Sequence, residues 1–198
     1  MRRIADNILG NVSLILNGVA DARARRAQGS WKHTYAYIQP IHLADDNKVI
    51  GSSSLGRDEL IDEKYLVRRG DILVRRLNPS TVNLITQDFA DTAVSSNLFI
   101  IRVKQGYDAA YVAFIIECQG LLALSSHCVG SGSAIRTISS STLREIGMPA
   151  LPLEKQKIFG ALWLLDKRRK RLQIELGEEY ETMMRIAIRK ATKIRLEG

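Results

Sequence analysis

The sequence has little of what stabilises small secreted domains or binds metals. Its 198 residues include only two cysteines, Cys118 and Cys128, and no C-x-x-C pair, so no disulfide framework is indicated. The three histidines, His33, His42 and His127, are scattered, and no metal site is expected. Two isolated thiols are typical of a protein that stays in a reducing compartment.

Long apolar runs are also absent. The N-terminal run Val12–Leu16 is too short for the apolar core of a signal peptide. No window approaches the ~20 apolar residues that a spanning helix needs. Proline is scarce and there is no low-complexity tract, which argues against wholesale disorder. These absences predict a folded cytoplasmic protein that has no membrane partner.

Catalytic motifs are missing as well. The chain contains no G-x-x-x-x-G-K-[ST], no G-x-G-x-x-G at a strand–helix junction, no H-E-x-x-H and no G-x-S-x-G. The segment GSGSAIR at 130–136 lacks the Lys-Ser/Thr ending of a phosphate-binding loop. Asn78–Ser80 lacks the second proline and the aromatic residue of an amino-methyltransferase loop. We therefore expect a binding protein with no cofactor; the alternative is a small nuclease or methyltransferase whose motifs are not recognisable.

What the chain does have is positive charge. Lys and Arg number 29 against 21 Asp and Glu, which gives a net charge of +8 and a pI near 9.7. Such an excess favours a polyanionic partner, nucleic acid before an anionic membrane. A merely basic protein without such a partner is the alternative that charge alone leaves open.

The hydrophobic pattern predicts a mixed α and β domain followed by one long helix. β-Formers or apolar runs bounded by turn residues mark strands, and apolar residues at helical spacing mark a helix over 108–127, with Tyr111, Phe114 and Ile115 on one side. The predicted strands are 34–43, a hairpin at 65–76 with a Gly-Asp turn, 82–86 and 93–104.

The C-terminal part changes character after Pro152. From Leu153 to Leu196 there is no proline, and helix formers dominate. A helix of that length would extend for roughly 65 Å at ~1.5 Å per residue, too long to pack wholly on its own domain. A heptad seam runs along it, interrupted by Arg169 and Glu179. The apolar residues of this seam are Ile158, Leu162, Leu165, Leu172, Leu176, Met183 and Ile186.

Several segments in this order resemble the specificity (S) subunit of type I restriction–modification systems. The segments are KYLVRRGDILVRR, AVSSNLFIIRV, AAYVAFII and the stretch GSGSAIRTISSSTLREIGMPALPLEKQKIFGALWLLDK. The last one leads through a Leu-x-x-Ile turn and a proline-bounded entry into the long helix. The family usually has Pro-Pro-Leu-x-Glu-Gln-x-x-Ile there, whereas Ala150-Leu151 separates the prolines here and Lys155 follows Glu154. The resemblance covers residues 60–170 well and the first 60 only loosely.

The resemblance implies an α+β fold, with a mixed α/β target recognition domain at 1–152 and a long α-helix at 153–198 that forms an antiparallel coiled coil. In the family such helices set the distance between two half-sites and dock the methyltransferase subunits. With one domain and one helix, the chain looks like a half-length S subunit that works as a homodimer. The implied partners are double-stranded DNA, a DNA methyltransferase (modification) subunit and a restriction subunit.

Candidate DNA-binding residues come from three segments. Base edges favour contacts from Arg, Asn and Gln on loops, whereas phosphates accept from Lys, Arg, hydroxyls and backbone amides. The predicted residues are Arg23, Arg25, Arg26, Lys32 and His33 in the first segment, Arg68, Arg75 and Arg76 around the predicted hairpin, and Ser131, Ser133 and Arg136 in the Gly/Ser loop. For each segment a solvated structural loop is the alternative.

Two further readings stay open. A helix-dimerised DNA-binding regulator without restriction–modification partners would show the same charge and seam. A truncated S gene product that folds but is inactive would also match. The cationic run at 166–171 has three interpretations of its own: a solvated helix face, a phosphate contact or a nuclear localisation signal.

Overall fold

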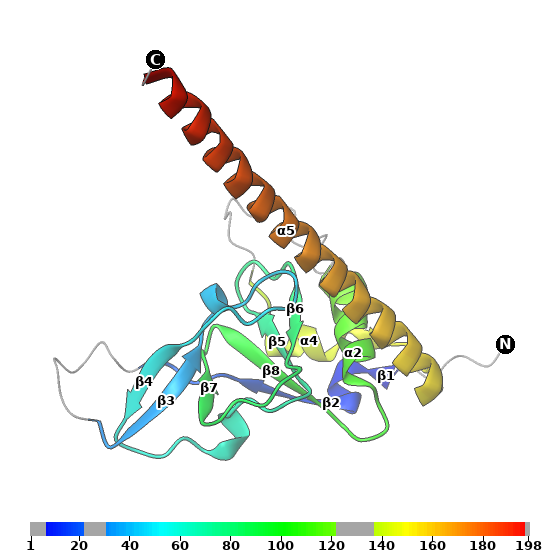
Figure 1. Ribbon diagram of the computed structural model, residues 1–198. Coiled ribbons are helices and arrows are strands. Elements are labelled where there is room, and N and C mark those ends of the chain that lie inside the picture. Colours follow the sequence, from blue (N-terminus) through cyan, green and yellow to red (C-terminus); the bar gives the residue numbers. More distant parts are fainter. Residues whose placement is uncertain (1–6, 22–30, 122–136, 197–198) are drawn as a thin grey trace, which may run out of the picture.

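The computed structural model describes residues 7–21, 31–121 and 137–196 (Figure 1). The first described part holds β1 (Asn7–Ile8), α1 (Leu9–Val12) and β2 (Ser13–Asn17). The elements that follow are β3 (His33–Ile38), η2 (Pro40–His42), β4 (Ser53–Arg57), η3 (Glu63–Tyr65), β5 (Asp71–Arg75), β6 (Val82–Leu84), β7 (Thr92–Val94), β8 (Leu98–Val103), α2 (Ala109–Ile115), η4 (Ile116–Gly120), α4 (Ser140–Arg144), β9 (Gly147–Met148) and α5 (Leu153–Leu196).

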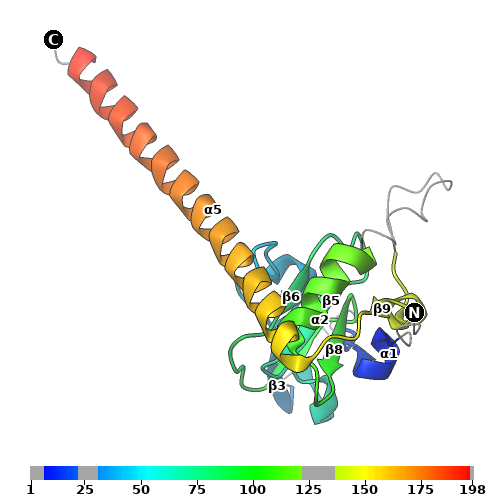
Figure 2. The same ribbon diagram turned by 90° about the vertical axis from the view of Figure 1, so that its right-hand side faces the viewer.

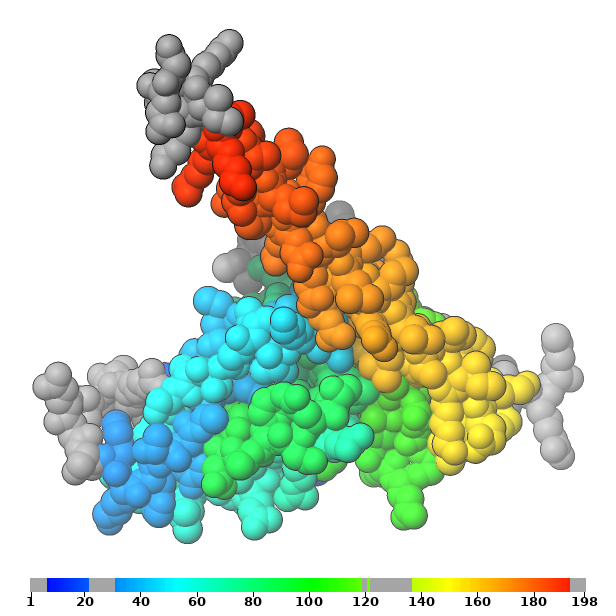
Figure 3. All heavy atoms as spheres, viewed as in Figure 1, coloured from blue at the N-terminus to red at the C-terminus, as the bar shows by residue number. Residues whose placement is uncertain are grey.

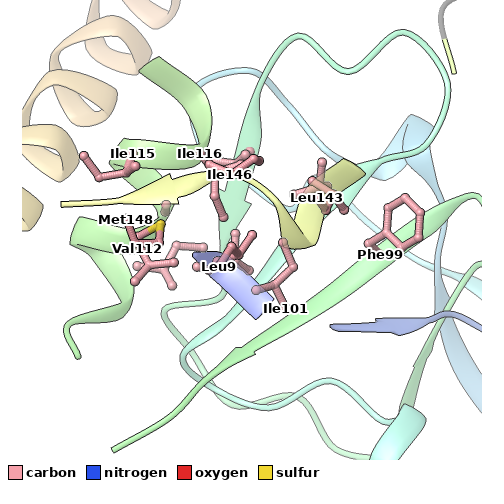
Figure 4. Packing of buried hydrophobic residues seen from close by; sticks show 14 of the residues in the cluster. Leu9, Phe99, Ile101, Val112, Ile115, Ile116, Leu143, Ile146 and Met148 are labelled. Carbon is pink, nitrogen blue, oxygen red and sulfur yellow. The ribbon is translucent and has the colours of Figure 1, made fainter. Parts of the chain in front are cut away.

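The central sheet has the strand order β2-β8-β5-β6, and all its strands are antiparallel. Both of its faces are buried, because successive side chains of a strand point to opposite faces. On β5, Ile72 and Val74 pack into a core with α1, α2 and α4, whereas Leu73 packs into a second core on the other face. The first core is the one shown in Figure 4.

A smaller sheet covers the second face. Its order is β4-β3-β7, with β3 antiparallel to β4 and parallel to β7. Ile38 of β3 and Val94 of β7 join the second core, and Tyr35 and Tyr37 form a third cluster with Leu55 of β4. A third sheet pairs β1 with β9, so the N-terminal and C-terminal ends of the domain are fixed to each other.

Helix α5 begins at Leu153, where the sequence predicts it to begin, and is 44 residues long. Its first turns lie against α2, and the rest projects away from the domain (Figures 1 and 2). The space-filling view shows the C-terminal half of α5 standing clear of the domain (Figure 3). No described helix, α5 included, has a stretch apolar enough to cross a bilayer.

The predicted hairpin at 65–76 is wrong. Residues 63–65 form a 3-10 turn, Leu66 makes only an isolated bridge to Ala93, and Gly70 adopts a φ of 90° just before β5. Strand β5 pairs with β6 and β8, which follow it in sequence, rather than with the preceding residues. The residues before Gly70 lack the alternation of apolar and polar side chains that marks a half-buried strand, because two arginines follow directly after Val67.

Candidate nucleic-acid interface and helix surface

Arginines stand at both ends of strand β5, two at each end. Arg68 and Arg69 precede the strand, and Arg75 and Arg76 end it. Residues rise ~3.3 Å each along a strand, so the two ends of the five-residue β5 lie about 13 Å apart. The four cations therefore do not surround one turn, and each pair has its own surroundings.

Asp71 fixes the turn at the first end of β5. Its side chain is almost fully buried and accepts the backbone N–H of Arg68 at 2.9 Å. It also accepts two hydrogen bonds from the Arg102 guanidinium, at 2.8 and 2.7 Å, across the register that pairs β5 with β8. The hydrogen bonds that Arg102 donates to the Asp71 carboxylate raise the pKa of Arg102 above its ordinary value. Asp71 thus has a structural role, as the sequence predicts from its place in a turn.

This turn presents Arg68 and Arg69 to solvent. The Arg68 side chain is 54% exposed and lies 3.6 Å from a carboxylate oxygen of Glu63. Arg69 is exposed and has no ion-pair or hydrogen-bond partner among the described residues. Because neither residue belongs to a strand, their side chains are not forced to point to opposite sides, as those of strand neighbours are. Arg69 is absent from the predicted set, and it is the more available of the two.

Arg75 and Arg76 are bound within the protein. Arg75 is 24% exposed, donates to the carbonyl of Leu43 and lies 3.9 Å from Asp45. Arg76 lies over the ring of Phe99, 5.2 Å from its centroid, and donates to a carbonyl oxygen at 3.3 Å. Both side chains fasten loops to the sheet. Their contact with DNA stays a prediction, and these contacts within the protein do not favour it.

Another basic group lies where β3 begins and β4 ends. Lys32 is exposed, His33 is half-buried, and His33 stands opposite Arg57 in the strand register. Arg57 donates to the carbonyl of Ala20. The ring of Trp31 lies so close to Gly56 that a Cβ there would come within 2.1 Å of a ring atom. The described residues just before 22 and just after 30 therefore lie together at this edge of the small sheet.

The remaining predicted DNA-binding residues fall outside the described part of the chain. Residues 22–30 contain three of them, and residues 122–136 contain the other three. The six residues are Arg23, Arg25, Arg26, Ser131, Ser133 and Arg136. Of the predicted residues that the structure describes, Lys32 and His33 are chain neighbours at the start of β3, whereas Arg68 and Arg75 lie at opposite ends of β5.

The junction between α5 and the domain uses four residues at helical spacing: Gln156, Gly160, Trp163 and Lys167. All four are buried. Gln156 accepts the backbone N–H of Asp108 at 3.0 Å. A Cβ at Gly160 would lie 2.4 Å from a carboxylate oxygen of Asp108, so only glycine allows α5 to approach this closely.

Lys167 completes the junction. Its side chain is 3% exposed and lies 2.8 Å from the Glu117 carboxylate, and it donates to the carbonyl of Asp45 at 2.8 Å. It also lies 5.4 Å from the centroid of the Trp163 ring. Glu117 comes from the π-helical turn η4 and accepts the backbone N–H of Val82. Lys167 thus connects α5 with η4, a loop and the central sheet, which corrects the interpretation of the run 166–171 as a uniformly solvated face.

The seam residues lie on the other side of α5. Nine residues, about two and a half turns at 3.6 residues per turn, separate Gly160 from Arg169, so the seam faces away from the domain. All described side chains from 172 to 192 are exposed, and a shallow groove lies along Leu165, Arg169, Leu172 and Leu176. The exposed fractions of the predicted seam residues are Ile158 59%, Leu162 57%, Leu165 59%, Leu172 52%, Leu176 68%, Met183 68% and Ile186 50%.

The far half of α5 has further apolar residues outside the seam. Tyr180, Met184 and Ile188 follow one another at a spacing of four residues and are 64%, 44% and 57% exposed. Tyr180 follows the seam residue Leu176 by four residues and borders the seam, whereas Met184 lies about 100° around the helix from Met183 and Ile188 lies further round. A second helix laid along the seam would leave Met184 and Ile188 uncovered.

Solved structures similar to this chain include the following three. One, from work on complex assembly and conformational transition of the type I R-M system, aligns over 91% of this chain with a TM-score of 0.62 and 15% identity. The HsdS subunit from Thermoanaerobacter tengcongensis aligns over 89% with a TM-score of 0.59 and 16% identity. The type I restriction-modification S subunit from M. genitalium aligns over 90% with a TM-score of 0.51 and 18% identity. No protein-family model and no curated protein matches the chain.

The structural likeness confirms the predicted fold, a mixed α/β domain followed by a long helix. The aligned parts are 47%, 46% and 44% of those three chains, so this chain spans about half their length. Within the residues described, no group of three His, Cys, Asp or Glu side chains is placed to bind a metal ion.

Proposed function

We propose that this protein is the DNA sequence-recognition component of a type I restriction–modification system and has no catalytic activity of its own. The observation that carries the proposal is the fold, a basic α/β domain with a long projecting helix, which is shared over about 90% of the chain with S subunits. The net charge of +8 is consistent with a DNA partner.

In this proposal the domain binds DNA through two exposed basic groups. Lys32 and His33 lie at the β3–β4 edge, and Arg68 and Arg69 lie on the turn before β5. Phosphate contacts of this kind supply affinity that falls steeply with salt. Arg25 and Arg26 lie outside the described residues, and their contacts with DNA stay predictions from the sequence.

The helix α5 supplies two surfaces for assembly. The seam takes a second copy of the chain, which gives two recognition domains, and the stripe of Tyr180, Met184 and Ile188 takes a helix of a modification subunit. This explains why apolar residues of α5 occupy more of its circumference than one partner helix covers. A restriction subunit would join the complex through the modification subunit.

The test is selection of bound DNA from a random library by the chain together with its modification subunit. We expect one enriched sequence, and reversing the charges of Arg25 and Arg26 should abolish binding while dimerisation is intact. No enrichment by the complex would contradict the proposal. A methyl-transfer assay with the chain alone should show no incorporation, and incorporation would contradict the non-catalytic role.

A helix-dimerised regulator that acts without restriction–modification partners is the second candidate. It is favoured only by the seam, since a regulator needs no second apolar stripe. Capture of a purified modification subunit by the chain separates the two candidates, and substituting Met184 and Ile188 with Glu should abolish the capture under the first.

A further inference from the structure

We infer that the seam of α5 pairs with a second copy of the chain in antiparallel orientation and in one register, which the charged pair Arg169 and Glu179 selects. The inference rests on the proposed function and adds to it the register of the dimer. In this register the position numbers of facing residues add up to 348. The facing pairs are Leu162 with Ile186, Leu165 with Met183, Arg169 with Glu179, and Leu172 with Leu176.

The charges within the seam carry the argument. Arg169 and Glu179 are exposed on the helix and interrupt an otherwise apolar seam. In the inferred register each lies opposite a residue of the other sign, and the two-fold axis makes the pair occur twice. A polar residue at one seam position is the best-attested device for fixing the register and orientation of paired helices.

Other arrangements leave these charges without partners. A shift by one heptad in either direction places Arg169 against Leu172 or against Ile186, and buries its charge next to an apolar side chain. Parallel pairing in register places Arg169 against Arg169 and Glu179 against Glu179, where like charges repel. Only the antiparallel register with the axis near position 174 satisfies both residues.

Existing ion pairs do not compete strongly with this arrangement. Arg169 lies 2.7 Å from Asp166 on its own helix, but its side chain is 58% exposed, and pairs of this kind are weak. Glu179 has no ion-pair partner within the described chain. The seam also faces away from the described residues that α5 packs against, so a second helix laid along it does not collide with them.

The test is charge reversal with rescue, measured on the full chain by sedimentation equilibrium. R169E and E179R should each raise the dimer dissociation constant by ~100-fold or more, because two like-charge contacts form in each dimer. The double variant R169E/E179R should dimerise like the unchanged chain. An equimolar mixture of the two single variants should form a heterodimer, since all its seam charges are again opposite.

The matched controls are R185E and E178R, which make the same substitutions at exposed positions about 130° around the helix from the centre of the seam. They should leave the dimer unchanged, and circular dichroism should show equal helix content in all variants. Dimers that persist in both single variants, or a double variant and a mixture that stay monomeric, would overturn the inference. An unchanged chain that is monomeric would overturn it too. None of these readouts involves DNA, so failure here is separate from failure of the proposed DNA recognition.

Discussion

At the scale of single residues, two buried ion pairs have different roles. Asp71 with Arg102 shapes the turn that exposes Arg68 and Arg69, and Lys167 with Glu117 connects α5 to the domain. Neither pair has a signal in the sequence. Each joins residues far apart in the chain, and Lys167 sits within a run of cations whose other members are exposed or paired on the helix itself.

Replacing Lys167 with Met should destabilise the fold by ~3–5 kcal/mol, because it leaves the half-buried Glu117 carboxylate uncompensated. The matched control is Lys170→Met, which removes an exposed ion pair with Asp166 and should cost less than about 1 kcal/mol. Urea denaturation followed by circular dichroism measures both. Similar losses in the two variants would show that the buried pair contributes no more than the exposed one.

Arg69 should contribute one phosphate contact to DNA binding. Arg69→Ala should weaken binding uniformly across sequences and reduce the slope of log K against log salt by about 1. Arg75→Ala should lower stability, because the side chain holds the carbonyl of Leu43, while it changes that slope little. Binding measured by fluorescence anisotropy at several salt concentrations separates the two effects. An unchanged slope in Arg69→Ala would place the contact elsewhere.

At the scale of elements, the hydrophobic pattern of the sequence predicted strands and helices correctly where the burial of side chains is regular along the element. The strand predicted at 93–104 is present as two strands, β7 and β8, and β8 is a continuous apolar run buried on both faces, while the long helix begins at Leu153 as predicted. The predicted hairpin failed because β5 takes its partners from later in the chain. In its described part, the helix predicted at 108–127 is α-helical over Ala109–Ile115 and continues as a π turn that carries Glu117, and residues 122–127 lie outside the described chain. A local pattern does not contain these pairings.

The candidate site, like the fold, could be predicted from the sequence only where its residues follow a periodic pattern. The seam is a periodic feature, and its residues are exposed as an unpartnered seam requires. The basic residues of 68–76 were recognised by charge alone, which does not distinguish Arg69 on a turn from Arg75 held by a loop carbonyl. That distinction depends on Gly70, Asp71 and Leu43, which come together only in the folded domain.

The two glycines of α5 should respond in opposite ways. Gly160→Ala places a Cβ 2.4 Å from Asp108 and 2.8 Å from Ala110, so it should push α5 off α2 and lower stability. Gly177→Ala meets no atom within 4 Å and should stabilise the helix by ~1 kcal/mol, since alanine has the higher helix propensity. Thermal unfolding of both variants measures the effects. A stabilising Gly160→Ala would mean that α5 does not pack closely on α2.

At the scale of the whole molecule, the dimer would hold two domains at a fixed distance. The junction covers residues 156–167, and the axis near 174 places the partner's junction about 25 residues further along, or ~38 Å at ~1.5 Å per residue. Because each domain packs on the side of its helix that faces away from the seam, the two domains would lie on opposite sides of the helix pair, and ~38 Å is their separation along the rod only.

Because the dimer has two-fold symmetry, the selected DNA should contain two inverted half-sites at one fixed separation. The variant L165E/L172E should be monomeric, because it places four carboxylates in the seam. The same selection should then return a single half-site, bound more weakly because the second contact is lost. A monomeric variant that still selects both half-sites at the fixed separation would show that a surface other than the seam holds the two domains together.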